Sequence, residues 1–196
     1  MTICIKTARS TDEIDGVFRA RYRIYVEQEH YMKPRNDRRI FDRFDAYPST
    51  ANIILADNSR VVGGVRFMEQ AVAGTSGDEF FEFSAYLPQK DEKTGSGSML
   101  FLESSYRDAR GLSFKLMAMG FYWAHCRKIS FITGVINPER ERFFLRFGFR
   151  MLASPMYDDE RQLHFIPVLL DMRELPATVI SFIESQRGDI YRVTGS

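Results

Sequence analysis

Glu103 is the residue whose surroundings first suggest chemistry. It ends the apolar run of residues 99–102 and begins the polar segment Ser104–Tyr106. Partial burial disfavours the charged form of a carboxylate and makes it a better proton acceptor. Glu103 is therefore a candidate general base. The strand context by itself fits a surface carboxylate on an edge strand slightly better.

A second set consists of charged residues that are far apart in the sequence. Asp42 and Asp45 lie in an arginine-rich segment, residues 33–47, and Arg21 lies on the apolar face of a predicted helix. The two carboxylates could fix a cationic amine, or order Arg21 and Arg66 through charge-assisted hydrogen bonds. A solvated charge run and a magnesium site are the other interpretations.

The bulk composition indicates one domain, residues 1–196, large enough to bury a core. Lysine and arginine number 27 against 26 acidic residues, so no global field selects nucleic acid or an anionic membrane. No run approaches the roughly 20 apolar residues of a membrane span. Cys4 and Cys126 are predicted to be free thiols, and the three histidines lack metal-ligand spacing. We expect a cytoplasmic protein without nucleic-acid partners or a metal site.

Hydrophobic periodicity and turn residues predict an α/β fold, a mixed and mostly antiparallel sheet with helices on both faces. Ser10 and Glu13 form a capping-box signature at the first helix, and Asn137-Pro138 is a typical helix start. The predicted elements are strand 2–7, helix 14–25, a hairpin of strands 52–56 and 61–68, a short helix 79–86, strand 98–105, helix 112–126, strand 129–135, helix 137–148, strands 149–152 and 163–171, and helix 176–185. Residues 72–78 and 89–98 look like loops.

This order of elements, with Asn137-Pro138 leading through Phe143-Phe144 to residues 146–149, resembles the GNAT acetyltransferase superfamily. A sharper pattern upstream is similar to the acyl-homoserine-lactone synthases, the enzymes of autoinducer synthesis in quorum sensing. The residues that carry this pattern are Arg21, Tyr25, Tyr31, Asp42, Asp45, Arg66 and Glu103-Ser104-Ser105. Residues 135–149 look at least as similar to the related N-acyl amino acid synthases.

The resemblance implies an N-acyltransferase and assigns roles to individual residues. The implied catalytic residues are Glu103, Ser104, Ser105 and Tyr106, with backbone N–H groups around Ser104–Tyr106 as the oxyanion stabiliser. The implied acceptor-binding residues are Arg21, Tyr25, Tyr31, Asp42, Asp45 and Arg66. Two positions depart from the synthase pattern, because Tyr31 stands in place of a tryptophan and Tyr106 in place of an arginine.

The donor side follows from the same resemblance. It implies no tightly bound cofactor and an acyl-phosphopantetheine co-substrate, either acyl carrier protein or acyl-CoA. The implied donor-binding residues are Arg107, Arg110, Gly111 and Ser113. Arg110 and Leu112 stand where the pyrophosphate loop of CoA enzymes has glycines, so acyl carrier protein is the favoured donor and partner. Either a basic docking patch or ordinary surface charge accounts for Arg107, Arg110, Lys115, Arg127 and Lys128.

Several functions remain open at this level. The small-molecule acceptor is S-adenosylmethionine, which gives an acyl-homoserine lactone, or a free amino acid. The alternatives are an ordinary acetyl-CoA-dependent acetyltransferase and a non-catalytic acyl-binding or sensing module. Most of the phenylalanine and methionine residues of the second half belong to the core, and some could line an acyl channel.

Overall fold

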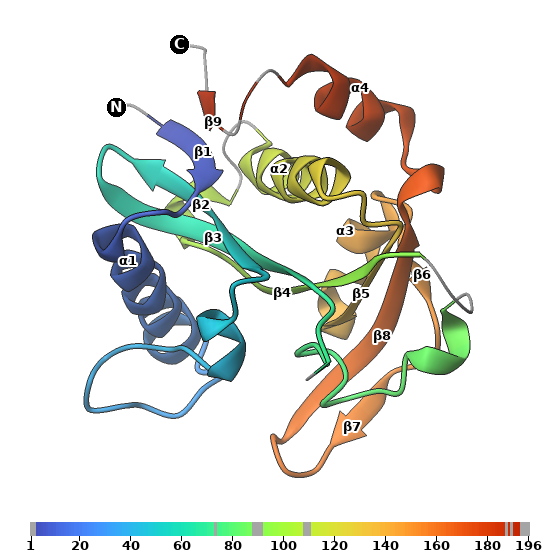
Figure 1. The fold of residues 1–196 in the computed structure, drawn as a ribbon. Coiled ribbons are helices and arrows are strands. Elements are labelled where there is room, and N and C mark those ends of the chain that lie inside the picture. Colours follow the sequence, from blue (N-terminus) through green and yellow to red (C-terminus); the bar gives the residue numbers. More distant parts are fainter. Residues whose placement is uncertain are drawn as a thin grey trace.

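The protein folds around one long mixed sheet (Figure 1). The structure is a computed structural model that describes residues 3–72, 74–87, 92–107, 111–186, 188 and 190–192. Strand order is β6-β8-β5-β4-β3-β2-β1-β9, with β7 also paired to β8, and only the β4–β5 pair is parallel among the pairs described. The strands are β1 (Ile3–Thr7), β2 (Thr50–Asp57), β3 (Arg60–Glu69), β4 (Thr94–Leu102), β5 (Phe131–Ile136), β6 (Arg150–Met151), β7 (Met156–Asp158), β8 (Leu163–Asp171) and β9 (Ile190–Arg192).

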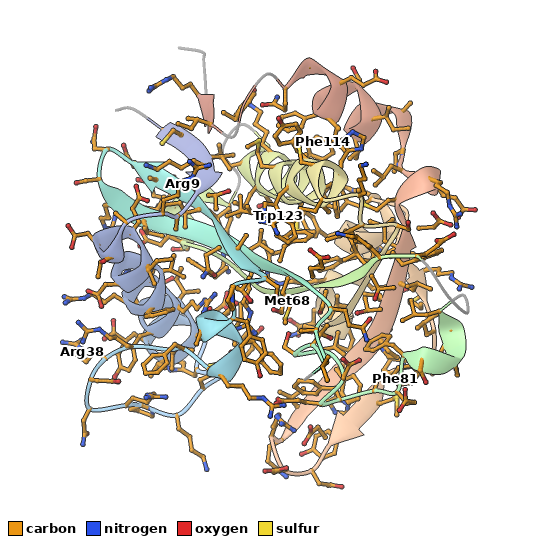
Figure 2. All side chains as sticks on the ribbon, in the orientation of Figure 1. Arg9, Arg38, Met68, Phe81, Phe114 and Trp123 are labelled. Carbon is orange, nitrogen blue, oxygen red and sulfur yellow. The ribbon has the colours of Figure 1, made fainter. Side chains whose placement is uncertain are left out.

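Helices cover both faces of this sheet, as the sequence predicted. Helix α1 (Thr11–Tyr22) packs on β2 and β3. Helix α2 (Leu112–Cys126) packs on the same two strands and also contacts α4 (Ala177–Ser185). Successive residues of a strand point to opposite faces, so Ile54 joins the core under α1 while its neighbours join the core under α2. Side chains fill both layers (Figure 2).

Helix α1 begins where its sequence predicted. Ser10 accepts a hydrogen bond from the Glu13 amide, and the Glu13 side chain accepts from the Ser10 amide, which completes the capping box. After Tyr22 the chain continues as a π-helical turn, Arg23–Gln28, which the sequence did not indicate. Wider turns of this kind are common at functional sites.

The prediction for β4 was partly wrong. The strand runs from Thr94 to Leu102, whereas we expected a start at Ser98 after a loop. The error arose because glycine is typical of loops. At Gly95, however, glycine allows close packing of the backbone, since an added Cβ would lie 2.7 Å from the Met68 carbonyl oxygen. Met99 has a φ of +52°, and the β3–β4 register shifts beside it. This bulge bends β4 ahead of the site.

Smaller elements also differ from expectation. The predicted helix 79–86 is only a 3₁₀ turn, Ser84–Tyr86, and the helix after Asn137 is a 3₁₀ turn followed by α3 (Glu141–Leu145). Strands β7 and β9 were missed, because three-residue strands carry too little periodicity to detect. The remaining 3₁₀ turns are Arg43–Ala46, Ser104–Tyr106 and Met172–Glu174. Among the described residues, no helix has the length and apolar character needed to cross a membrane.

Candidate active site

The centre of the site is the gap where β4 and β5 separate, which we call the wedge. The two strands pair only through Thr94–Ser96 and Phe131–Thr133, and beyond these residues they diverge. A mostly apolar cavity of about 60 Å³ lies there. Its lining residues are Val65, Phe67, Gly97, Ser98, Met99, Leu100, Met117, Thr133, Gly134, Val135, Ile136, Phe144, Phe149 and Val168. The wedge can therefore hold an apolar group beside exposed backbone.

Side chains rather than a neighbouring strand bind the diverging edge of β4. The Tyr25 hydroxyl donates to the Leu100 carbonyl oxygen at 3.0 Å, and Arg107 Nε donates to that of Leu102 at 2.9 Å. Burial raises the pKa of Tyr25, so the hydroxyl stays protonated and keeps donating. Tyr25, predicted in the acceptor site, is thus in contact with a residue that lines the cavity.

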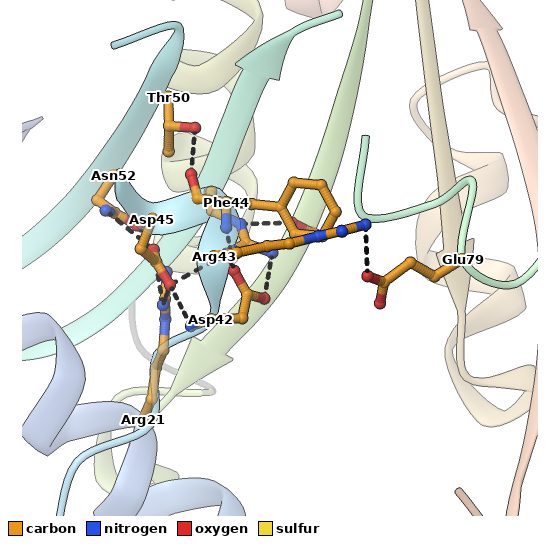
Figure 3. A network of polar contacts seen from close by, with 10 residues as sticks. Arg21, Asp42, Arg43, Phe44, Asp45, Thr50, Asn52 and Glu79 are labelled. Atoms are coloured by element: carbon orange, nitrogen blue, oxygen red, sulfur yellow. Dashed lines mark hydrogen bonds and ion pairs between the residues drawn. The ribbon is translucent and has the colours of Figure 1, made fainter. Parts of the chain in front are cut away.

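The structure brings four of the predicted acceptor residues together with Asn52 in what we call the buried cluster (Figure 3). Arg21 Nη1 donates to both oxygens of Asp45 at 3.0 and 2.8 Å, and its Nη2 donates to Asn52 Oδ1 at 2.6 Å. Arg66 donates to both oxygens of Asp42 at 2.6 and 2.9 Å and to Asp45 Oδ2 at 3.1 Å. Arg21 and Arg66 are fully buried.

The three-residue spacing of the two aspartates has a local cause. They form a capping box around the turn Arg43–Ala46, in which Asp42 accepts from the Phe44 amide and Asp45 from the Asp42 amide. Burial by itself would raise the pKa of Asp42, but the hydrogen bonds and charge of Arg66 hold it below the usual value. Both carboxylates therefore order arginines, one of the two roles open from the sequence. Their role in acceptor binding stays a prediction.

Glu103 is buried, but two guanidinium groups occupy its carboxylate. Arg23 Nε donates to Oε1 at 2.7 Å, while Arg60 Nη2 lies 2.7 Å from Oε1 and 2.9 Å from Oε2. The sequence predicted partial burial but neither arginine partner. An oxygen that already accepts from a cation is poorly placed to take a proton from a substrate, so these contacts argue against a general base at Glu103. The role itself remains untested.

The other predicted catalytic residues lie on the turn that follows Glu103. Ser104 and Ser105 are exposed, and the Tyr106 amide already donates to the Glu103 carbonyl oxygen at 2.9 Å. The Tyr106 hydroxyl donates to Asp57 Oδ2 at 2.8 Å. We expected the oxyanion donors of this turn at a splayed strand, but the strands separate earlier, along residues 97–102. None of the four predicted catalytic residues, Glu103 and Ser104–Tyr106, lines the cavity.

The predicted donor residues are only partly described. Arg110 lies outside the described residues. Gly111 adopts a left-handed conformation, φ +65°, immediately before α2, and Ser113 lies in the first turn of that helix. Of the proposed basic patch, Lys115 lies near the start of α2 and Arg127 just beyond its end, which separates them by about 18 Å along the axis. Arg127 also stacks on Trp123, 4.9 Å from the ring centroid. A docking role for the patch stays a prediction.

A second group, which we call the open cluster, contains Glu29, Arg107 and Arg140 and was not predicted as a unit. Glu29 ends the π-helical turn, Arg107 follows β4 and Arg140 follows β5. Both arginines contact Glu29 Oε1, Arg140 at 3.4 Å. Beside it, Asn137 Nδ2 donates to the half-exposed Tyr31 hydroxyl at 3.3 Å. No sequence signal marks Glu29 or Arg140, because the contacts join segments about 80 and 110 residues apart.

The mixed sheet with helices on both faces and its two diverging central strands give the chain the fold of GNAT-type N-acyltransferases. Its structure is similar to an acyl-CoA N-acyltransferase from Pseudomonas aeruginosa, with a TM-score of 0.61 at 13% identity, covering 86% of this chain and 99% of that one. No curated protein matches the sequence.

The chain belongs to the N-acyl amino acid synthase FeeM family, whose model matches residues 16–171. FeeM from uncultured soil microbes has a TM-score of 0.72 at 16% identity, covering 89% of this chain and 93% of that one. BjaI, a CoA-dependent acyl-homoserine lactone synthase solved with MTA, has a TM-score of 0.74 at 19% identity, covering 93% and 88%. At these identities the likeness of the structures concerns the fold, and the family model carries the assignment to acyltransferases.

Proposed function

We propose that this chain acts in the cytoplasm and transfers a fatty-acyl group from a phosphopantetheine thioester to the α-amine of a free amino acid. The observation that carries the proposal is the apolar cavity in the wedge, which is bordered by Leu100 and lies next to the Tyr25 hydroxyl. An acyl chain in the cavity would set the thioester against the polar edge of β4. The family model, that of an N-acyl amino acid synthase, supports the choice of acceptor.

For the donor, we propose acyl carrier protein ahead of acyl-CoA. The support is the sequence of residues 107–113, in which Arg110 and Leu112 replace the glycines of a pyrophosphate loop. Arg107, at the edge of the wedge, remains the proposed contact for the phosphopantetheine arm. BjaI is described as CoA-dependent, which makes acyl-CoA the donor to compare.

Two observations favour further candidates. BjaI has been solved with SAM and isopentyl-CoA, and the pattern that this chain shares with the homoserine-lactone synthases supports S-adenosylmethionine as a second acceptor. The cavity of about 60 Å³ is small, which favours a short acyl group such as acetyl. A longer chain would require flexible lining residues such as Met117 to move.

The test is a product screen with purified protein. Acyl donors of increasing chain length, each as acyl carrier protein and as CoA thioester, are incubated with the twenty amino acids and S-adenosylmethionine. Mass spectrometry then reports chain and acceptor together. We expect N-acyl amino acids, faster turnover with acyl carrier protein, and an advantage that shrinks with salt because protein docking is charge-driven.

Four results would redirect the proposal. Homoserine lactones alone would replace the amino acid by S-adenosylmethionine, and acetylated products alone would identify an ordinary acetyltransferase. Equal use of both donors without a salt effect would remove acyl carrier protein as the preferred donor. Acyl-group binding without any product would identify a non-catalytic acyl-binding module.

A further inference from the structure

Four carboxylates with side chains mostly removed from solvent surround the wedge and the buried cluster: Asp42, Asp45, Glu103 and Glu29. An acceptor amine needs one of them, because a cationic amine in a partly dry site requires an acceptor with a negative charge. In the first three, every carboxylate oxygen already accepts from an arginine. They are therefore engaged in holding the fold.

Glu29 differs in how its two oxygens are used. Arg107 and Arg140 both contact Oε1. Oε2 is buried and has no hydrogen-bond partner among the described residues. The side chain is 11% exposed. A buried, unsatisfied carboxylate oxygen costs free energy unless another molecule supplies the missing donor, so this atom is available to an N–H group of a ligand.

The position of Glu29 suits the reaction. Its two partners come from the segments that follow the diverging strands, Arg107 after β4 and Arg140 after β5, and Arg107 also binds the Leu102 carbonyl oxygen on the edge of β4. Glu29 thus joins the two segments that follow the diverging strands. Its charge also acts on Tyr25, whose hydroxyl binds Leu100 in the cavity wall.

We propose that Glu29 is a catalytic residue that binds the amino group of the acceptor through Oε2 and takes a proton from it, an inference that rests on the proposed function. The ammonium gives one proton to Oε2, and the neutral amine attacks the thioester carbon. The C–N bond forms, the C–S bond breaks, and the departing thiolate takes the second proton from nitrogen. Glu29 then releases its proton to solvent. Arg107 and Arg140 hold Oε1 so that Oε2 faces the acceptor.

The experiment compares Glu29→Gln with Glu27→Gln, an exposed carboxylate of the same π-helical turn that pairs with Arg38 on the surface. Each variant is assayed with the amino acid acceptor and with its aminooxy analogue, which keeps the carboxylate but whose terminal amine is uncharged at neutral pH. For Glu29→Gln we expect kcat/KM for the amino acid to fall about a hundredfold. The analogue should lose about tenfold less, with the donor KM and Tm near those of Glu27→Gln.

The outcomes that contradict the role of Glu29 differ from those that contradict the proposed function. An equal loss with both acceptors, or a loss that follows a fall in Tm, would overturn the role of Glu29 and leave acyl transfer intact. Calorimetric titration of the amino acid provides a readout apart from turnover, and Glu29→Gln should abolish binding that Glu27→Gln retains. A wild-type protein that binds the amino acid without acylating it would defeat the proposed function alone. One that neither binds nor acylates it would defeat both.

Discussion

The buried cluster and the open cluster use the same residue types for different ends. In the buried cluster, Arg21 and Arg66 meet two aspartates and every carboxylate oxygen has a guanidinium donor. In the open cluster, two arginines share one oxygen of Glu29 and leave the other without a described partner. Pairing of every carboxylate oxygen compensates the buried charge, whereas an unsatisfied carboxylate oxygen is maintained at a cost that ligand binding would offset.

The comparison explains why charge alone is a poor guide to a site. The motif Asp42-x-x-Asp45 is the more conspicuous in sequence, yet its spacing serves a capping box and two buried arginines. Glu29 carries no motif, and its chemical character comes from neighbours on two distant segments. A carboxylate is best judged by which of its oxygens remain free.

Asp45→Asn should cause the largest loss of stability. A small loss would contradict the comparison of the two clusters. It removes the charge that compensates two fully buried arginines, and breaking a buried pair costs about 3–5 kcal/mol. At about 2–4 °C per kcal/mol for this chain length, thermal melts should show a marked loss of Tm. The matched variant Asp42→Asn, at a carboxylate 32% exposed, should lose less.

Asp45→Asn also distinguishes a role of the buried cluster in acceptor binding from a purely structural role. If the buried cluster binds the acceptor directly, the acceptor KM of Asp45→Asn will rise at a temperature well below its melting point while the donor KM stays unchanged. We expect both Michaelis constants to move together, because the loop carrying both aspartates would loosen.

Glu103→Gln tests a carboxylate whose oxygens are both occupied. A general base at this position would lose about a hundredfold or more in rate. The contacts with Arg23 and Arg60 instead predict a stability loss of about 1–2 kcal/mol, modest because both arginines are partly exposed. We expect the fall in kcat/KM for the amino acid to be smaller than for Glu29→Gln. A greater fall, with an unchanged Tm, would restore Glu103 as the base and contradict the rule drawn from the two clusters.

Phe144→Ala should enlarge the cavity in the wedge and shift activity by several fold toward longer acyl chains. Phe144 lines the cavity, whereas its neighbour Phe143 packs on Phe147 and does not. Phe143→Ala is therefore the matched control, similar in burial and in the ring removed. Relative kcat/KM across a donor series measures the shift. Identical profiles for the two variants would show that the acyl chain does not enter the wedge.

Glu13→Gln should give the smallest effect, and it compares the partly exposed pair of Lys6 and Glu13 with the buried cluster. Burial would raise the pKa of Glu13, but the amides of Arg9 and Ser10 and the charge of Lys6 lower it to about 2. A depressed carboxylate pKa stabilises the fold above the ordinary value of 4.5, and this contribution is lost as the pH falls toward 2. The variant should lose about 1 kcal/mol or less at pH 7. Melts recorded from pH 7 to 2 should show the difference from wild type disappearing, and a difference independent of pH would contradict the assignment.

The sequence by itself determined the architecture and the local parts of the site. Periodicity and caps placed α1, α2, the β2–β3 hairpin and β8 close to their observed bounds, because these signals arise from neighbours within one turn or one strand. The family pattern selected Arg21, Asp42, Asp45 and Arg66, which do meet in space.

Only the tertiary structure decided which of these charges remain available for chemistry. Hydrogen-bond saturation depends on partners brought together by the sheet, such as Arg23 and Arg60 at Glu103, and no local pattern records those pairings. The separation of β4 from β5 beyond Ser96 and the β3–β4 register shift beside Met99 likewise come from the assembled sheet, and methionine rarely adopts the positive φ found at Met99. The open cluster joins the segments that follow these two strands, because Glu29 Oε1 contacts both Arg107 and Arg140.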